Sequence, residues 1–212
     1  MKLLVLGSTG SVGRIMVAQG LARGHAVMAQ TRDSARAAAL LPKARIMAAD
    51  PTDAVALTPL CAGQDAVIFA LGIDRGGPTT LFSDATRALL AAMAEARVER
   101  LVAITGVGAG ETRGHGGFLY DRIVFPLFTR HRYADKDRQE ALIRASGVAW
   151  TILRPAPFAA TPGTAPMQRM TAIAQTTRLT RVTREEVAGF ALDCAEQGLH
   201  LHEAVFFGHG RV

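Results

Sequence analysis

The chain has 212 residues, 49% of them apolar and 6% aromatic, which suits one domain with an aliphatic core that needs neither disulfides nor metals. Its net charge of +6 comes almost entirely from arginine, since Lys2, Lys43 and Lys136 are the only lysines. The arginines are scattered, and no apolar stretch reaches the roughly 18 residues of a membrane helix. These features argue against a nucleic-acid-binding protein and against a membrane protein.

The cysteines and the N-terminal residues favour a cytoplasmic setting. Cys61 and Cys194 stand far apart and match no metal-ligand or CxxC spacing, which is typical of a reducing compartment. The apolar run Lys2–Leu6 passes straight into a glycine loop, so we expect no signal peptide.

Short aliphatic runs alternate with helical segments in the first half of the chain, a pattern typical of βαβ units and a parallel sheet. Strands are expected at Lys2–Leu6, Ala26–Thr31, Ala44–Ala48, Ala66–Ala70 and Leu101–Thr105. Helices are expected between them at Ser11–Arg23, from Asp33 to Pro42, at Thr52–Leu60 and at Pro78–Ala96. Pro78 suits the first turn of the last of these.

The second half is less regular. A glycine-rich segment, Gly106–Gly117, precedes a helix expected over Phe118–Thr129 and Tyr133–Ala145, with a break near His131. The remaining expected elements are a strand at Trp150–Leu153, a loop at Pro155–Pro166, a short helix at Met167–Thr176, a helix at Arg184–Gln197 and a strand at Ala204–Gly208.

The pattern predicts an α/β fold: a single Rossmann-like domain over residues 1–212, with a doubly wound parallel sheet and helices on both faces. Right-handed crossovers place the first six strands in the order 3-2-1-4-5-6, with a cofactor crevice at the carboxyl ends of the first and fourth. A small irregular part at about residues 154–182 is expected to cover the substrate.

A glycine loop follows the first strand and opens the first helix. It reads Gly7-Ser8-Thr9-Gly10-Ser11-Val12-Gly13. Gly7 permits a tight turn, Gly10 lets the backbone approach a pyrophosphate, and Gly13 lets the helix pack on the strand. The backbone N–H groups of Thr9, Ser11 and Val12 would then face the anion at the helix N-terminus. The loop predicts a dinucleotide site.

The residues after the second strand favour NADP over NAD. NAD sites place an acidic residue there for the ribose 2′-hydroxyl, whereas NADP sites use arginine for the 2′-phosphate. Here Thr31 is followed by Arg32, with Arg36 one helical turn further on, and guanidinium groups suit a phosphomonoester. Asp33 is the complication, because it could accept a ribose hydroxyl, but it also fits the N-cap of the following helix.

Taken together, these motifs resemble the atypical short-chain dehydrogenase/reductase superfamily. The Gly-x-x-Gly-x-x-Gly spacing is joined by Ala49–Asp53 after the third strand, Ala70-Leu71-Gly72 after the fourth, and Ser146–Pro155, which looks like the group's "SG-x-x-WTI-x-RP" stretch. Within this superfamily the chain resembles the NAD(P)H-binding, NmrA-like proteins that include biliverdin-IX-β/flavin reductase. The resemblance implies that Asp50 and Pro51 lie by the adenine. It also implies that Leu71, Gly72 and Thr105 line the nicotinamide side.

The chain departs from this superfamily at the catalytic residues. The usual pattern is Tyr-x-x-x-Lys with a serine after the fifth strand, whereas this chain has Tyr133 three residues before Lys136 and Thr105 in place of the serine. Residues i and i+3 still lie near one another on a helix, so Tyr133, Lys136 and Thr105 stay the candidate catalytic residues. Lys136 would hold the ribose or stabilise developing charge.

An incomplete proton donor favours an acceptor that needs little acid catalysis. A carbonyl requires a proton on oxygen during hydride transfer, whereas a flavin, quinone or tetrapyrrole delocalises the charge. We therefore expect an NADP-dependent oxidoreductase acting on a small conjugated acceptor, as a monomer or homodimer. One alternative is a carbonyl reductase or epimerase-like enzyme using Tyr133 and Lys136, and another is a non-catalytic NADP-sensing protein.

Three further features have more than one interpretation. The glycine-rich segment could cover the acceptor, with His115 as a proton donor or a solvated loop residue. Phe118, Tyr120, Phe125 and Phe128 could wall a flat ring or belong to the core. His200, His202 and His209 lie near the carboxyl end, and His200 and His202 would share a face of an extended segment, but no third ligand or carboxylate has a convincing spacing, so no metal is expected.

Overall fold

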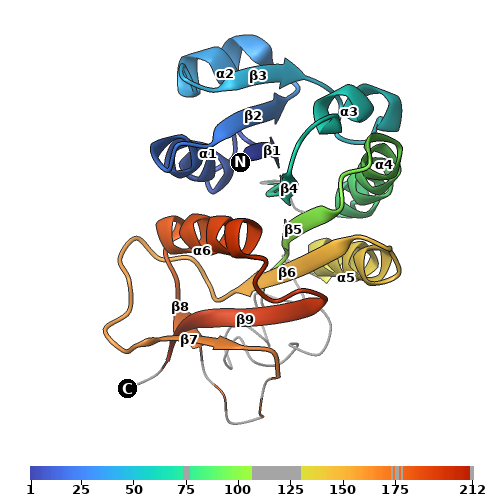
Figure 1. The fold of residues 1–212 in the computed structure, drawn as a ribbon. Helices are drawn as coiled ribbons and strands as arrows, with labels where there is room; N and C mark the ends of the chain where they lie inside the picture. Colours follow the sequence, from blue (N-terminus) through green and yellow to red (C-terminus); the bar gives the residue numbers. More distant parts are fainter. Residues whose placement is uncertain (74–76, 107–129, 173, 175–176, 178, 211–212) are drawn as a thin grey trace.

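The computed structural model describes residues 1–73, 77–106, 130–172, 174, 177 and 179–210. Within these residues the strands form one sheet in the order β3-β2-β1-β4-β5-β6-β9-β7, with β8 also paired to β9 (Figure 1). The strands are β1 (Lys2–Leu6), β2 (Ala26–Thr31), β3 (Arg45–Ala48), β4 (Ala66–Phe69), β5 (Arg100–Ile104), β6 (Ala149–Pro155), β7 (Met167–Met170), β8 (Leu179–Arg181) and β9 (Glu203–Gly210). The predicted order of the first six strands is confirmed.

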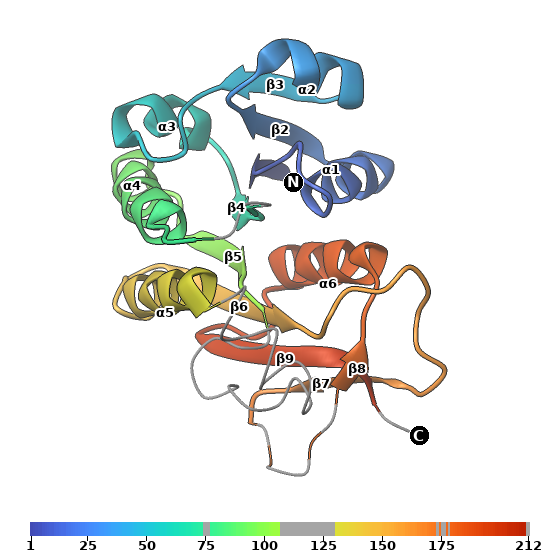
Figure 2. The same cartoon turned by 180° about the vertical axis from the view of Figure 1, so that it is seen from behind.

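The helices cover both faces of this sheet, as the turned view in Figure 2 also shows. They are α1 (Gly13–Ala22), α2 (Ser34–Leu40), α3 (Ala54–Cys61), α4 (Leu81–Ala96), α5 (Arg130–Arg144) and α6 (Arg184–Gln197). Side chains alternate along the strands: Leu3 and Val5 pack with α1 and α6, whereas Leu4 and Leu6 pack with α3 and α4. A parallel sheet buried on both faces has this pattern, so the predicted α/β Rossmann-like fold is confirmed.

Several helix ends are fixed by the side chains that the sequence places there. Asp33 accepts the backbone N–H of Arg36, and Asp53 accepts that of Ala56. Thr183 and Glu186 form a capping box at the start of α6. These caps satisfy N–H groups that lack a partner in the first turn, and they explain where α2, α3 and α6 begin.

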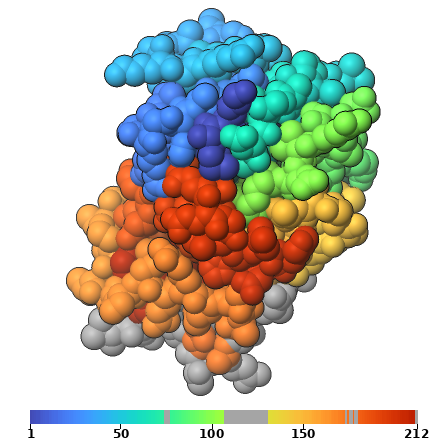
Figure 3. All heavy atoms as spheres, viewed as in Figure 1, coloured from blue at the N-terminus to red at the C-terminus, as the bar shows by residue number. Residues whose placement is uncertain are grey.

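The edge beyond β6 differs from the prediction. The expected helix at Met167–Thr176 is wrong, because Met167–Met170 is strand β7, antiparallel to β9. β8 is antiparallel to β9 as well. In the space-filling view the orange and red segments that contain these strands form the lower part of the molecule (Figure 3). The short polar run carries no clear helical or strand period, and only pairing with β9 decides its conformation.

Two other boundaries differ from the prediction. α4 begins at Leu81 rather than Pro78, and among the described residues α5 begins at Arg130 rather than Tyr133, so His131 is helical. The expected helical residues 118–129 lie outside the described part of the chain. None of the described helices is both long and apolar enough to cross a bilayer.

Candidate active site

A cavity of about 750 Å³ lies at the carboxyl ends of the parallel strands, the edge where open α/β sheets bind ligands. Its lining comes from the turns after β1, β2, β4, β5 and β6, so segments far apart in the sequence meet there. The volume is in the range of small-molecule sites. The candidate residues that line it are Gly7, Thr9, Gly10, Ser11, Val12, Thr31, Arg32, Arg36, Pro51, Leu71, Gly72, Thr105, Tyr133 and Lys136.

The glycine loop has the geometry of an anion cradle. Gly7 has φ +76°, and a Cβ on Gly13 would lie 2.1 Å from the Gly7 oxygen, so both positions require glycine. A Cβ on Gly10 would meet only the Gly7 oxygen, at 3.2 Å, and would otherwise enter the cavity. Within the described residues no backbone acceptor takes the N–H of Ser11 or Val12. These features fit a bound pyrophosphate.

Gln30 on β2 fixes this loop, a role that sequence reasoning missed. Its Oε1 accepts the backbone N–H of Gly7 at 3.2 Å, and its Nε2 donates to the Ala49 carbonyl at 2.7 Å. The hydroxyl of Ser8 donates to the Gln30 carbonyl at 2.7 Å. A buried glutamine inside a strand is unusual, and that polar residue in an otherwise apolar strand is the signal that could have identified it.

Arginines gather at the end of the cavity beside β2. Arg32 and Arg36 are exposed there, and Arg14 from the first turn of α1 joins them. Asp33 is used as the α2 N-cap. The candidate Asp50 does not line the cavity: its carboxylate accepts from the backbone and hydroxyl of Thr52, and these bonds hold its pKa below the usual range.

At the other end of the cavity, Thr105 belongs to a buried polar chain. Its hydroxyl donates to Glu140 of α5 at 2.7 Å. Glu140 is in turn paired with Arg154 of β6, which donates from Nε at 3.0 Å and from a guanidinium Nη. Glu140 and Arg154 are 4% and 1% exposed. The Thr105 hydroxyl therefore uses its proton in the hydrogen bond to Glu140, and the hydroxyl oxygen can accept a hydrogen bond from a ligand.

Lys136 is buried beneath the cavity. Its ammonium donates to the Ile104 carbonyl at 3.0 Å and lies 3.8 Å from the centre of the Phe82 ring. Burial lowers its pKa to about 7, against the opposing influence of Glu140 and Asp135. The amine can therefore change protonation state near neutral pH, as a proton-transfer group requires.

Tyr133 reaches the cavity despite its short spacing from Lys136. A Cβ on Gly106 would lie 3.3 Å from the Tyr133 hydroxyl, so the phenol lies against the turn after β5. Thr105, Tyr133 and Lys136 all line the same cavity. The three candidate catalytic residues are therefore brought together.

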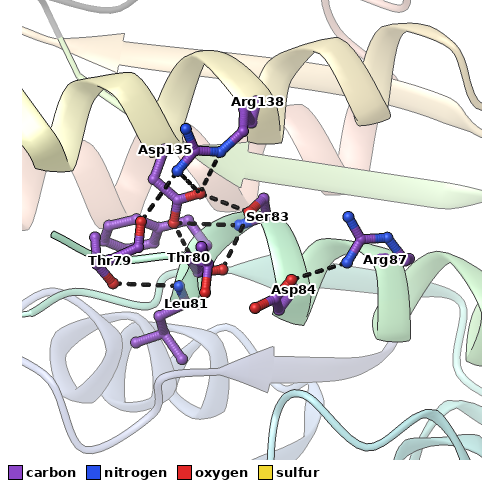
Figure 4. A network of polar contacts seen from close by, with 9 residues as sticks. Thr79, Thr80, Leu81, Ser83, Asp84, Arg87, Asp135 and Arg138 are labelled. Carbon is purple, nitrogen blue, oxygen red and sulfur yellow. Dashed lines mark hydrogen bonds and ion pairs between the residues drawn. The ribbon is translucent and has the colours of Figure 1, made fainter.

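Asp135 connects the two helices that hold this region (Figure 4). It is fully buried, and its carboxylate accepts the backbone N–H of Phe82 at 2.8 Å and the hydroxyl of Ser83 at 2.6 Å. A carboxylate at a helix N-terminus is favourable, so α5 supplies the cap of α4. This contact between α5 and α4 helps to position Lys136, the next residue, over Phe82.

The remaining candidates do not lie in the cavity or cannot be placed. His200 pairs with Glu203, and His209 pairs with Glu186. Among the described residues there is no group of three or more side chains that could hold a metal. His115 and the aromatic residues Phe118, Tyr120, Phe125 and Phe128 lie outside the described residues.

Comparison with known proteins gives a family match and several similar structures. A family model described as NAD(P)H-binding matches residues 7–198. A solved protein of Burkholderia pseudomallei is 26% identical, with a TM-score of 0.77, covering 99% of this chain and 100% of that one. An anaerobillin reductase from Escherichia coli O157:H7 is 20% identical, with a TM-score of 0.79 and coverage of 100% and 98%. A short-chain dehydrogenase/reductase from Veillonella parvula is 13% identical, with a TM-score of 0.81 and coverage of 98% and 94%. The last two likenesses show the fold alone.

Proposed function

The chain belongs to the NAD(P)H-binding family, and from that premise we propose that it is an NADP-dependent oxidoreductase acting on a small conjugated acceptor. A flavin, quinone or tetrapyrrole-like ring is the acceptor class. The observation that carries the proposal is the continuity of one cavity from the glycine loop to Tyr133 and Lys136. The resemblance to NmrA-like and biliverdin-IX-β/flavin reductases points the same way.

Different residues would serve different parts of the cofactor along the cavity. Ser11 and Val12 would donate backbone N–H groups to the pyrophosphate. Leu71, Gly72 and Thr105 line the cavity further along, where they would flank the nicotinamide. NADPH, when bound, supplies the hydride, becoming NADP⁺, and a proton completes the two-electron reduction of the acceptor. Lys136, whose pKa is lowered to about 7, can take up or release a proton near this point at neutral pH.

We propose that the acceptor lies against the segment after β6, in keeping with the expected covering part at about residues 154–182. Pro155, Ala156, Pro157 and Phe158 line the cavity there. Apolar walls exclude water and hold a flat ring at near-attack distance. The proposed setting is the cytoplasm, with the protein as a monomer or homodimer and without nucleic-acid, membrane or metal partners.

The choice of NADP rests on Arg32, and its replacement tests it. In Arg32→Ala, we expect the Kd for NADPH to rise by a factor equivalent to about 1.5–3 kcal/mol, because a charged hydrogen bond to the 2′-phosphate is lost. The Kd for NADH should change little. Titration by fluorescence measures both, and Arg45→Ala, an exposed arginine outside the cavity, is the matched control. Equal losses for the two cofactors would contradict the assignment.

An acceptor panel tests the reaction. NADPH and NADH oxidation should be followed with flavins, quinones and simple aldehydes, and we expect turnover with the conjugated acceptors and NADPH. The position of Tyr133 beside Gly106 supports a carbonyl reductase as the second candidate. Turnover of aldehydes that Tyr133→Phe abolishes would favour that candidate. Tight NADP binding without turnover of any acceptor would indicate a sensor.

A further inference from the structure

The cavity is lined by an unusually one-sided set of charges. Among the described residues that line it there are five arginines and one lysine but no aspartate or glutamate. Arg14, Arg32 and Arg36 lie by β1 and β2, where the cofactor phosphates account for them. Arg132 and Arg184 stand apart from that group, on the elements that flank β5 and β6.

Arg184 is the first residue of α6 and stands beside an aromatic ring. Its guanidinium carbon lies 4.9 Å from the centre of the Phe158 ring. Phe158 is held there because it forms a parallel bridge with Val182, and the backbone N–H of Ala159 donates to the Val182 carbonyl. The ring is 43% exposed. The Nε of Arg184 is buried and has no hydrogen-bond partner among the described residues.

Arg132 approaches from the other face of the sheet, in the first turn of α5. Arg132 and Lys136 line the same cavity, and the charge of Arg132 adds to the lowering of the Lys136 pKa that burial causes. Its Nε is also buried and has no hydrogen-bond partner in the described part of the chain. A buried donor without a partner costs about 1–3 kcal/mol, and two such donors at one cavity point to a ligand that accepts from them.

We propose that this end of the cavity binds an anionic acceptor, whose carboxylate or phosphate groups are held by Arg132 and Arg184 while its flat ring lies on Phe158. The inference rests on the proposed function, because it names the acceptor class of the same site. Arginine suits oxyanions, since its planar fork donates two parallel hydrogen bonds.

Paired probes that differ by one anionic group test the proposal. FMN and riboflavin differ by a phosphate, and a naphthoquinone carboxylate and menadione provide the carboxylate arm. With the NADP-saturated protein we expect the anionic member of a pair to bind about 10- to 100-fold more tightly, as for a charge-assisted hydrogen bond. The same preference should appear in KM during turnover with NADPH.

Two variants locate the preference. Arg132→Gln and Arg184→Gln should each reduce it about tenfold while leaving the Kd for riboflavin and menadione nearly unchanged. Arg181→Gln is the matched control, because Arg181 is exposed and lies outside the cavity lining. Melting temperatures of all three variants show whether the fold is kept.

The possible outcomes separate this proposal from the function on which it rests. Anion-selective binding without turnover would overturn the oxidoreductase and leave the anion site standing. Equal affinity for charged and neutral members in both pairs would overturn the anion site alone. A higher Kd for NADPH in Arg184→Gln, with the acceptor preference unchanged, would assign that arginine to the cofactor and overturn its role here.

Discussion

Replacing Arg154 with methionine is expected to lower the free energy of unfolding by about 3–5 kcal/mol. The substitution keeps an unbranched side chain in the core but removes the guanidinium that holds Glu140. Glu140 is 4% exposed, so its carboxylate would remain buried with the Thr105 hydroxyl, the more distant Arg144 and the charge of Lys136 as its neighbours among the described residues. A buried charge that loses its ion-pair partner is among the few single changes with an effect this large.

Removal of the Arg154 guanidinium should also affect the candidate active site. Thr105 donates to the same carboxylate oxygen that accepts from the Arg154 Nε, so a shift of Glu140 would move the Thr105 hydroxyl at the cavity wall. We therefore expect weaker NADPH binding in Arg154→Met even at temperatures where the variant is folded. Denaturant unfolding measures the stability, and fluorescence titration measures the binding.

Two controls isolate the burial of the pair. Arg144 lies 3.8 Å from Glu140, but its side chain is 42% exposed, so Arg144→Gln should cost no more than about 1 kcal/mol. The double variant Glu140→Leu/Arg154→Met removes both charges and should recover most of the lost stability. If Arg154→Met were as mild as Arg144→Gln, the ion pair would not hold this part of the structure.

Replacing Lys136 with methionine is expected to make the protein more stable at and below neutral pH. Burial lowers the pKa of Lys136 from 10.5 to about 7, so the charged amine is unfavourable in the folded chain. This lowering of the pKa corresponds to about 5 kcal/mol of folding free energy, because a tenfold change in proton affinity is worth about 1.4 kcal/mol. Methionine fills a similar volume without charge.

The free energy of unfolding should depend on pH in a direction that follows from the lowered pKa of Lys136. Between pH 7 and 10.5 the unfolded chain holds a proton on Lys136 that the folded chain has released. Stability contributed by this residue therefore rises with pH across that window, because unfolding takes up a proton. The advantage of Lys136→Met should be largest below pH 7 and should shrink as the pH rises.

Melting temperatures of the wild type and the variant, measured from about pH 6 to about pH 9, test the window. Lys43→Met is the matched control, because Lys43 is exposed. Its melting temperature should change with pH in the same way as that of the wild type. A Lys136→Met curve that also runs parallel would show that Lys136 keeps its proton in the folded state throughout. NADPH oxidation by the same variant would show separately whether this amine takes part in turnover.

The sequence alone was sufficient for the βαβ order and for much of the cavity lining beside the glycine loop. The glycine loop and Arg32 lie on contiguous stretches, where the backbone path follows from the alternation of strand and helix. Glycine spacing is a local property, so Gly7 and Gly13 could be given their roles before any contact was known. The cap at Asp33 is local in the same sense.

Only the tertiary structure determined which residues meet at the other end of the cavity, near Thr105 and Phe158. Three contacts join groups that are separated in sequence, and no periodicity predicts them. They are Glu140 with Arg154, Asp135 with the N-terminus of α4, and Phe158 with Arg184. The strand at Met167–Met170 likewise exists because β9 offers it an edge. Local pattern determines most of the elements and the turns that line the cavity beside the glycine loop. The burial of Lys136, which lowers its pKa, and the placement of Arg132 and Arg184 on the cavity lining depend on long-range packing.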